Sequence, residues 1–524
     1  MTTRHETGLA APEDRAETPG DDPQTQGDES PSPDEAEVRA LLRFSGEIAT
    51  KSRRTRARFQ RRLTRNLRDA LDSQAVPAVV RPEWSRVFID GPDDTFLDPL
   101  ERVFGISSYS VLRGETEADL ERIVERGVGL FGDEVKGRTY AVRARRSGEH
   151  PFSSHDVQQH LGAALNPGAT VNLGNPDVAV RIEIRDDRAF FYADRHRGAG
   201  GLPLGVQGRA LCLLSGGFDS AVAAWMALRR GIVLDYVFCN LGGGAYKRMV
   251  VEVGKHMADQ WSYGTRPRLH VVDFTEVVEA MRVRAKPAYL QVVLKRMFYR
   301  AAARIGAGLD TQALVTGESV GQVSSQTLTN LRAIDDASDL PVLRPLLGFH
   351  KEEIIARSRE IGTYELSARV REYCQVAPDK PVTAASPEDA RAQEDAVGHV
   401  ELNSAIESLE VLDLRGLRMS DIVGAGLFVT AVEPGVTVLD TRDPGAYEAW
   451  HWPRAARHAL EALERDFKRL DRNEVYVLYC AEGVRTANLA ERMQREGYEA
   501  YSFMGGVPAL RRLANRLDQR SDDA

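Results

Sequence analysis

Short apolar runs separated by polar stretches divide the chain into segments with different secondary-structure patterns. Between residues 138 and 205 the runs TYAVRARR and VAVRIEIRD flank the stretch HPFSSHDVQQHLGAAL, which is a strand, helix, strand pattern. From Val180 to Arg185 apolar residues alternate with charged ones. This alternation predicts a strand with one solvent-exposed face.

The preceding segment begins with a predicted strand and turn at 38–50 and continues as a basic helix. Phe59, Leu63, Leu67 and Leu71 repeat every four residues and predict one apolar stripe. Lys51 to Arg68 holds nine Lys or Arg residues and no acid. Crowded like charges repel, so either nucleic acid lies against this helix or the charges form a solvated face. The candidate contact residues are Arg53, Arg54, Arg58, Arg61 and Arg65.

A central segment alternates strand-like and helical stretches. Strand-like runs stand at 211–214 and 232–239, and shorter ones at 271–273 and 313–315. This order is typical of a parallel sheet wound on both faces, where ligands bind at the carboxyl ends of the strands.

The sequence LCLLSGGFDS at 211–220 predicts an anion site at one such strand end. Gly216 and Gly217 let the backbone approach a phosphate, and Ser215, Asp219 and Ser220 stand where the first amides of a helix are unpaired. No Gly-Lys-Ser/Thr follows, so transfer of a γ-phosphate is disfavoured. The alternative is an ordinary turn between a strand and a helix.

A second α/β unit is predicted near the carboxyl end. Apolar runs at 436–439 and 475–479 predict strands, and a helix is expected at 487–497. The second strand leads into Cys480, at the start of a loop that contains Arg485. A thiol beside a helix amino terminus and an arginine is expected to favour the thiolate, the nucleophilic form. A buried structural cysteine is the alternative.

Length and composition limit the classes of protein. The 524 residues, 42% of them hydrophobic, predict several packed domains. Residues 1–37 carry eleven acids and two arginines, which accounts for the net charge of −8 and predicts a solvated, disordered tail. The four cysteines suggest neither a metal knuckle nor a disulfide framework. No membrane span or signal peptide is found, so we expect a cytoplasmic protein without a membrane partner.

Several motifs resemble known families. S-G-G-x-D-S resembles the PP-loop of ATP pyrophosphatases, and the stretch from Arg138 to the glycine-rich 198–205 resembles a THUMP domain. The Cys480 loop, Asp440-x-Arg442 and the turn at 505–508 resemble a rhodanese domain, although Trp450-His451-Trp452-Pro453 departs from that family's Gly-His-Ile-Pro. TGESVGQVSSQTLTNL at 316–331, with PVLRPLLGFHKEEI at 341–354, resembles the tRNA 4-thiouridine synthetases, the ThiI-type tRNA sulfurtransferases.

This resemblance implies an α/β multidomain fold. The implied parts are a disordered acidic tail (1–37), an N-terminal ferredoxin-like region with the basic helix (38–90), a THUMP RNA-binding domain (91–195), a PP-loop domain with a doubly wound parallel sheet (206–380), a linker (381–415) and an α/β rhodanese domain (416–518).

The resemblance also implies the site residues. Lys351 would assist activation together with Asp219, Cys480 would carry persulfide sulfur beside Arg485, and Cys374 would be the second thiol. Cys212 and Cys239 are interpreted as core residues. The implied ATP-binding residues are Leu213, Leu214, Ser215, Gly216, Gly217, Asp219, Ser220, Lys295, Gly317 and Gln326.

The implied reaction is adenylation of a uridine at position 8 of tRNA, followed by replacement of its O4 with sulfur. ATP and Mg²⁺ are the expected cofactors. A cysteine desulfurase would load Cys480, and a cellular thiol reductant would reopen a Cys374–Cys480 disulfide. The resemblance further implies sulfur supply for the thiazole ring of thiamine, with a sulfur carrier protein as a partner. The alternatives are an enzyme that adenylates a small molecule and a non-catalytic RNA-binding or sulfur-carrying adaptor.

Overall fold

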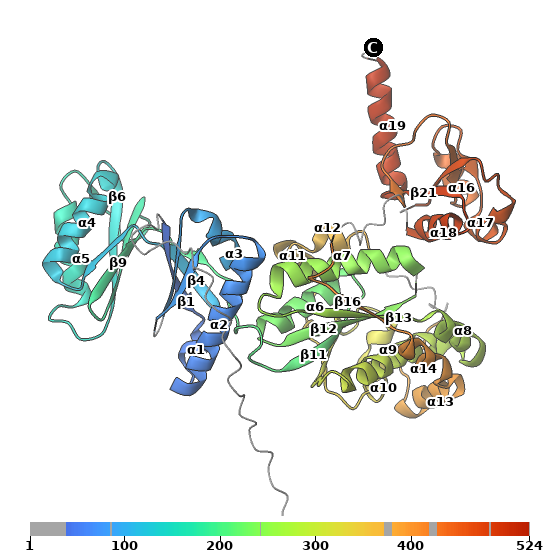
Figure 1. Cartoon of the computed structure of the whole chain (residues 1–524), viewed down its shortest axis with the longest axis horizontal. Helices are drawn as coiled ribbons and strands as arrows, with labels where there is room; N and C mark the ends of the chain where they lie inside the picture. Colours follow the sequence, from blue (N-terminus) through green and yellow to red (C-terminus); the bar gives the residue numbers. More distant parts are fainter. Residues whose placement is uncertain are drawn as a thin grey trace, which may run out of the picture.

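The described part of the chain forms four sheets (Figure 1). The computed structural model describes residues 38–83, 86–241, 243–370, 380–418, 427–481 and 484–522. The predicted acidic tail lies outside these ranges. Among the described residues, no helix combines the length and apolar character needed to cross a membrane.

The first sheet is antiparallel and has the order β10-β4-β1-β3-β2. Helix α2 covers it, and Leu63, Leu67 and Leu71 of the predicted apolar stripe are buried in its core. Strand β4 pairs with β1, so this sheet extends past the boundary predicted at residue 90. Its elements are β1 (Val38–Phe44), α1 (Gly46–Ala49), α2 (Arg53–Ser73), β2 (Val79–Pro82), β3 (Arg86–Gly91), α3 (Leu97–Leu100), β4 (Ile106–Val111) and β10 (His196–Arg197).

The second sheet has the order β5-β9-β8-β6-β7 and stands between β4 and β10 in the sequence. The predicted strand, helix, strand pattern is confirmed, because parallel strands β6 and β8 flank α5. Its elements are β5 (Gly114–Glu117), α4 (Leu120–Val135), β6 (Thr139–Ser147), α5 (Ser154–Leu165), β7 (Thr170–Val171), β8 (Val178–Arg185) and β9 (Arg188–Tyr192).

One prediction for β8 is wrong. Glu183 was expected on a solvent-exposed face, but it is only 4% exposed. Its carboxylate pairs with Arg43 and Arg86, which belong to the first sheet. The charged face of β8 is therefore the place where the first two modules meet.

The third sheet has the order β15-β14-β11-β12-β13-β16, and helices pack on both faces, as predicted. Five strands are parallel, and β16 is antiparallel to β13. Its elements are β11 (Arg209–Leu213), α6 (Phe218–Arg229), β12 (Val233–Asn240), α7 (Gly243–Trp261), β13 (Arg268–Asp273), α8 (Thr275–Arg284), α9 (Leu290–Ala307), β14 (Leu314–Val315), α10 (Leu328–Asp335), β15 (Val342–Leu343), α11 (Lys351–Glu360), α12 (Tyr364–Ser367), α13 (Pro387–Val397), α14 (Val400–Glu407) and β16 (Glu410–Asp413).

The prediction of a linker at 381–415 is wrong. This segment forms α13, α14 and β16, all of which pack against the central sheet or its helices. Glu394 of α13 is 1% exposed and pairs with Arg296 and Arg300 of α9, at 2.5 and 2.8 Å. Several apolar residues of this segment, such as Ala390 and Leu402, belong to the core.

The fourth sheet is parallel and has the order β17-β21-β20-β18-β19. Its two hydrophobic clusters belong to this domain alone, which is typical of a separately packed unit. Its elements are β17 (Phe428–Val429), β18 (Thr437–Asp440), α16 (Pro444–Ala449), β19 (Ala456–Arg457), α17 (Leu460–Asp466), β20 (Val475–Tyr479), α18 (Val484–Arg495), β21 (Glu499–Phe503) and α19 (Gly506–Asp522).

Replacing Glu394 by Ala tests whether α13 is part of the central domain. The change removes the carboxylate that pairs with buried Arg296, so we expect a loss of about 3–5 kcal/mol in the stability of this domain. Hydrogen exchange of the β11–β13 amides would measure it. Asp395→Ala is the matched control, because Asp395 is the exposed neighbour on the same helix. Equal exchange in both variants would contradict the assignment.

Candidate functional site

The glycine turn between β11 and α6 has the geometry of an anion site. Gly216 has a φ of +79°, which L side chains rarely adopt, and extended Gly217 is the N-cap of α6. Ser220 holds the turn from inside the helix. Its hydroxyl accepts a hydrogen bond from the Ser215 amide at 3.2 Å and donates one to the Gly217 carbonyl at 3.1 Å.

A pocket of about 220 Å³ lies at the carboxyl ends of β11, β12 and β14. Gly216 and Gly217 form the adjoining turn. Val237, Phe238 and Cys239 of β12 also line the pocket, although no motif in the sequence marks Val237 or Phe238. The predicted ATP-binding residues that line the pocket are Leu213, Leu214, Ser215, Asp219, Ser220, Lys295, Gly317 and Gln326.

Gly317 brings the end of β14 against the glycine turn. A Cβ atom at this position would lie 2.5 Å from the Asp219 carbonyl carbon and 2.6 Å from the Ser220 amide nitrogen. These are backbone atoms, which cannot move aside as a flexible side chain would. Only glycine permits this approach of the two segments.

Asp219 and Lys351 meet at the mouth of this pocket. The Lys351 Nζ lies 2.7 Å from Asp219 Oδ1 and 3.0 Å from Oδ2, and Gln322 Nε2 donates to Oδ2 at 2.8 Å. Lys351 is the first residue of α11, 132 positions beyond Asp219. The fold thus brings together the two residues that the sequence analysis assigned to activation.

Glu318 is a pocket residue that the sequence analysis did not select. It is 3% exposed, and its Oε2 accepts hydrogen bonds from Tyr299 at 2.6 Å and Arg344 at 2.9 Å. Burial alone would raise the pKa of Glu318, but Lys295 and then Arg344 hold it below its usual value. Its Oε1 has no hydrogen-bond partner and lies 3.6 Å from Lys295 Nζ. The motif TGES contained this residue, but a motif does not show which carboxylate is buried.

The pocket offers few ligands for a metal ion. Its carboxylates, Asp219 and Glu318, are both paired with cations. No cluster of three or more His, Cys, Asp or Glu residues suited to a metal occurs in the described parts of the chain. A Mg²⁺ ion would fit here only if phosphate and water oxygens supplied most of its ligands, as is usual for this ion.

Cys212 and Cys239 are both buried, as interpreted from the sequence. Burial raises the pKa of the Cys212 thiol to about 12 and also raises that of Cys239. Neither thiol is suited to act as a thiolate nucleophile. Cys374 falls at 371–379, outside the described residues.

Cys480 follows β20 directly and is partly exposed. The Thr486 hydroxyl donates a hydrogen bond to its Sγ at 3.7 Å, and the Val507 amide donates to the Ala481 carbonyl at 3.2 Å. The loop is thus tied to the first turn of α18 and to the predicted closing turn at 505–508. Arg485 is exposed, and its guanidinium donates to Glu461 at 2.7 Å.

The strand that leads to Cys480 is held by a buried network. Asp440 is fully buried and pairs with Arg442 at 2.5 Å, and it accepts a hydrogen bond from the Tyr479 hydroxyl at 2.6 Å. The Trp452 amide donates to the same hydroxyl at 3.1 Å. The unusual Trp450-His451-Trp452-Pro453 segment is therefore hydrogen-bonded to the residue that precedes Cys480.

Two basic surfaces occur in the N-terminal half. The first is α2, on which all five predicted contact residues, Arg53, Arg54, Arg58, Arg61 and Arg65, are exposed. Arg62 faces the other way, and its guanidinium donates to the carbonyls of Leu204 and Gly264. The helix therefore packs against the central domain while its other side stays open.

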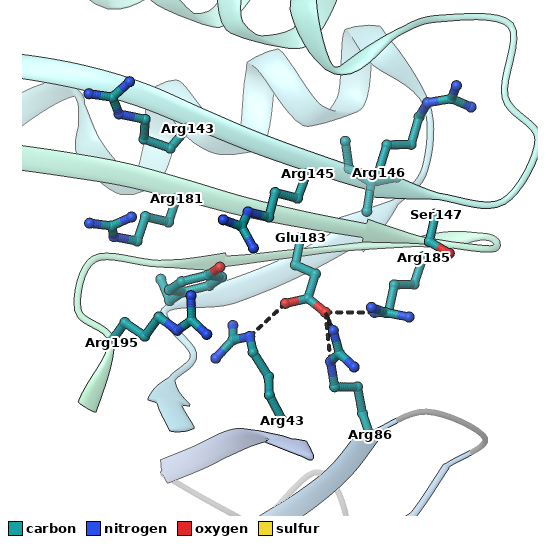
Figure 2. A pocket seen from close by; sticks show the side chains of 12 residues that line it. Arg43, Arg86, Arg143, Arg145, Arg146, Ser147, Arg181, Glu183, Arg185 and Arg195 are labelled. Carbon is teal, nitrogen blue, oxygen red and sulfur yellow. Dashed lines mark hydrogen bonds and ion pairs between the residues drawn. The ribbon is translucent and has the colours of Figure 1, made fainter. Parts of the chain in front are cut away.

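The second basic surface, which we call the arginine pocket, was missed by the sequence analysis. It is a cavity of about 240 Å³ between the first two modules, lined by eight arginines and one carboxylate (Figure 2). Glu183 lies among Arg43, Arg86 and Arg185, at 2.9, 2.7 and 2.6 Å (Figure 2). The lining arginines are Arg43, Arg86, Arg143, Arg145, Arg146, Arg181, Arg185 and Arg195.

The arginine pocket has an excess of positive charge. Burial opposes ionisation of Glu183, but Arg86, Arg43 and Arg185 lower its pKa to about 2, so it is ionised at neutral pH. One negative charge then faces eight guanidinium groups. The Nη2 of Arg43 is buried without a hydrogen-bond partner. Such a pocket suits the phosphates of a nucleic acid.

Domain-family models match four successive segments of the chain. They are the ThiI ferredoxin-like domain at 39–110, the THUMP domain at 117–194, the thiamine biosynthesis protein (ThiI) at 205–398 and the rhodanese-like domain at 430–512. Their order follows that of the four sheets.

Relatives named tRNA sulfurtransferase match most of the chain. The protein of Pyrobaculum aerophilum is 37% identical over 91% of this chain and 97% of its own length. That of Edwardsiella ictaluri is 34% identical over 88% of this chain and 98% of its own length. The chain belongs to the tRNA sulfurtransferase family.

A solved structure supports the same assignment. The crystal structure of a 4-thiouridine synthetase in complex with RNA and bound ATP is 30% identical, with a TM-score of 0.62. It covers 72% of this chain and 99% of that protein. The α/β multidomain fold expected from the family resemblance is confirmed.

Replacing Gly317 by Ala tests the glycine turn as the ATP site of this family member. The added Cβ must displace the backbone of Asp219 and Ser220, so we expect ATP affinity to fall by about tenfold or more. Titration calorimetry with ATP would measure the change. Gly348→Ala is the control, because a Cβ there meets no atom within 4 Å. Unchanged affinity in Gly317→Ala would show that the nucleotide binds elsewhere.

Proposed function

We propose that this protein is an ATP-dependent tRNA sulfurtransferase that converts a uridine, at position 8, to 4-thiouridine. The observation that carries the proposal is the pocket where Asp219 and Lys351 meet beside the glycine turn, in a chain whose fourth sheet presents Cys480. One domain is suited to activate an oxygen and the other to carry sulfur.

The first step is adenylation of the base. ATP would lie with its phosphates at the glycine turn and the start of α6, where backbone amides and Lys351 stabilise negative charge. The uridine O4 attacks the α-phosphorus, the bond to the bridging oxygen breaks and pyrophosphate leaves. Mg²⁺ bound mainly to phosphate and water oxygens would screen the charge. Lys295, with Glu318 behind it, supplies a second cation in the pocket.

The second step replaces the activated oxygen. A cysteine desulfurase places a sulfane sulfur on Cys480, and the Thr486 hydroxyl is positioned to donate to the sulfur of this residue. The terminal sulfur attacks C4 and AMP leaves, which links the base to Cys480 through a disulfide. Cys374 then attacks the Cys480 sulfur, forming a Cys374–Cys480 disulfide and releasing the thiolated base.

In the alternative order, Cys374 attacks the persulfide first, and the hydrosulfide released displaces AMP. Both routes end with the same disulfide, which a cellular thiol reductant must reduce with two electrons. Sulfur donation to an activated carrier protein for thiazole synthesis would use the persulfide on Cys480 and a thiol reductant, without the ATP pocket. It is therefore compatible with the same domain.

The arginine pocket favours RNA as the substrate over a small molecule. It lies in modules that stand outside the ATP pocket, and its charge suits several phosphates of one chain. An enzyme that adenylates a small molecule would use neither this pocket nor the open side of α2. A non-catalytic adaptor would not use the pairing of Asp219 with Lys351.

Two variants separate the proposed steps. In a mixture of tRNA, ATP, cysteine, desulfurase and reductant, Cys480→Ala should lower 4-thiouridine formation by about 100-fold or more while tRNA-dependent pyrophosphate release continues. Asp219→Asn should lower pyrophosphate release by a similar factor and still allow persulfide loading on Cys480. Absorbance of 4-thiouridine in the near ultraviolet and pyrophosphate release are the measurements. Normal 4-thiouridine formation by either variant would contradict the assigned role.

Replacing Arg143, Arg145 and Arg146 together by Ala tests the arginine pocket. Because fewer counterions are released on binding, the slope of log affinity for tRNA against log salt should fall by about 2–3. The triple replacement of Arg54, Arg58 and Arg61 should have a similar effect. Replacing Arg465, Arg469 and Arg472, which are exposed in the rhodanese domain, is the matched control. If the slope for either triple variant equals that of the control, the arginines replaced in that variant do not contact tRNA and form only a solvated face.

A further inference from the structure

The rhodanese domain contacts the central domain through a pair of helices in the described part of the chain. Helix α18 packs against α7 (Figure 1). Between them Glu491 pairs with Arg248 at 3.4 Å, and it also accepts a hydrogen bond from Arg495 of its own helix at 3.0 Å. Glu491 is nearly buried, with 14% of its side chain exposed. An acid on the outer side of a rhodanese helix is thus covered by another domain.

Gly244 makes room for this acid. A Cβ atom at Gly244 would overlap the carboxylate of Glu491, so the carboxylate lies directly on the backbone of the second residue of α7. The amino-terminal end of a helix carries partial positive charge, which favours a carboxylate there. Arg248, one turn further along, adds a full positive charge. We call Gly244 and Arg248 the docking surface.

The docking surface adjoins the ATP pocket. Tyr246 stands between its two residues in the sequence, lines the pocket, and donates its hydroxyl to the Ser215 carbonyl at 3.1 Å. The first turns of α7 therefore contact the glycine turn on one side and α18 on the other.

Helix α18 joins the cysteine loop to the docking surface. Glu491 lies seven residues beyond Val484, the first residue of α18, which corresponds to about 10 Å along the helix axis. Cys480 stands just before that start. A cavity of about 420 Å³ between the domains is bounded by Asn240 and Asp273, at the carboxyl ends of β12 and β13, and by Glu491 and Arg495 of α18. It opens at the same edge of the sheet as the ATP pocket.

We propose that the docking surface on α7 holds the rhodanese domain, through Glu491 of α18, in the position from which Cys480 delivers sulfur. This proposal rests on the proposed function. It makes Gly244, Arg248 and Glu491 positioning residues, which contact neither ATP nor the reacting sulfur. Their role is to keep the sulfur carrier beside the adenylated base.

The test is a single-turnover transfer experiment. The full-length protein is loaded with radioactive persulfide sulfur on Cys480, freed of desulfurase, and mixed with ATP and unmodified tRNA. Arg248→Glu should lower the rate of sulfur transfer to tRNA by about tenfold or more, because two carboxylates would then face each other. Gly244→Leu should do the same by filling the space of Glu491. Persulfide loading and tRNA-dependent pyrophosphate release should remain at the wild-type level in both.

A charge exchange supplies the positive control. Adding Glu491→Arg to Arg248→Glu should recover part of the lost transfer rate, since the pair with residue 248 is re-formed with reversed signs, while the amino-terminal end of α7 and Arg495 still favour a carboxylate at 491. Lys468→Glu, which disrupts an ion pair within the rhodanese domain alone, should leave transfer unchanged. Wild-type transfer rates in both Arg248→Glu and Gly244→Leu would overturn the docking proposal. Failure of the wild-type protein to thiolate tRNA would instead overturn the proposed function.

Discussion

The approach of Gly317 to the backbone of Asp219 and Ser220 is the contact on which the central site depends. This contact sets the distance between the end of β14 and the turn after β11. The pocket lies between these two segments and the end of β12. Parallel strand order makes the contact possible, because β14 and β11 are direct neighbours with their carboxyl ends at one edge. Glu318, next in the chain, is thereby buried beneath Lys295. Gly317 thus fixes both the glycine turn and, through Glu318, the position of Lys295.

Buried glutamates organise the positive charge of this protein in three separate places. Each has a pKa lowered by cations against the effect of burial, and each joins segments far apart in the sequence. A buried ion pair is a weak source of net stability, because desolvation offsets much of the attraction. Its contribution here is geometric, since one carboxylate holds several long, flexible cations in fixed positions. The three are Glu183 between the N-terminal modules, Glu318 in the pocket beside the glycine turn, and Glu394, which joins α13 to α9.

The sequence predicted features that depend on local pattern and missed those that depend on distant partners. The apolar stripe of α2 and the turn from β11 to α6 follow from spacing and residue type within about twenty positions. The burial of Glu183 cannot be predicted from local spacing, because its partner Arg43 stands 140 residues away. Helices α13 and α14 are short and mostly polar, so their signal resembled that of a linker. The motif TGES located Gly317, but only the fold shows that Glu318 lies buried behind Lys295.

Helix α7 gives a physical reason for joining the two chemistries in one chain. The proposed reaction has two reactive intermediates, a persulfide that any thiol can attack and an adenylated base that water can attack, so free diffusion of either would lose it. Tethering raises the effective concentration of one partner near the other, but a flexible tether leaves orientation to chance. A defined contact between α18 and α7 restricts orientation as well, because Cys480 is hydrogen-bonded to Thr486 in the first turn of α18. The contact must also be weak enough to release the rhodanese domain when Cys480 is loaded with sulfur again. A single, partly exposed ion pair between Arg248 and Glu491 meets this requirement.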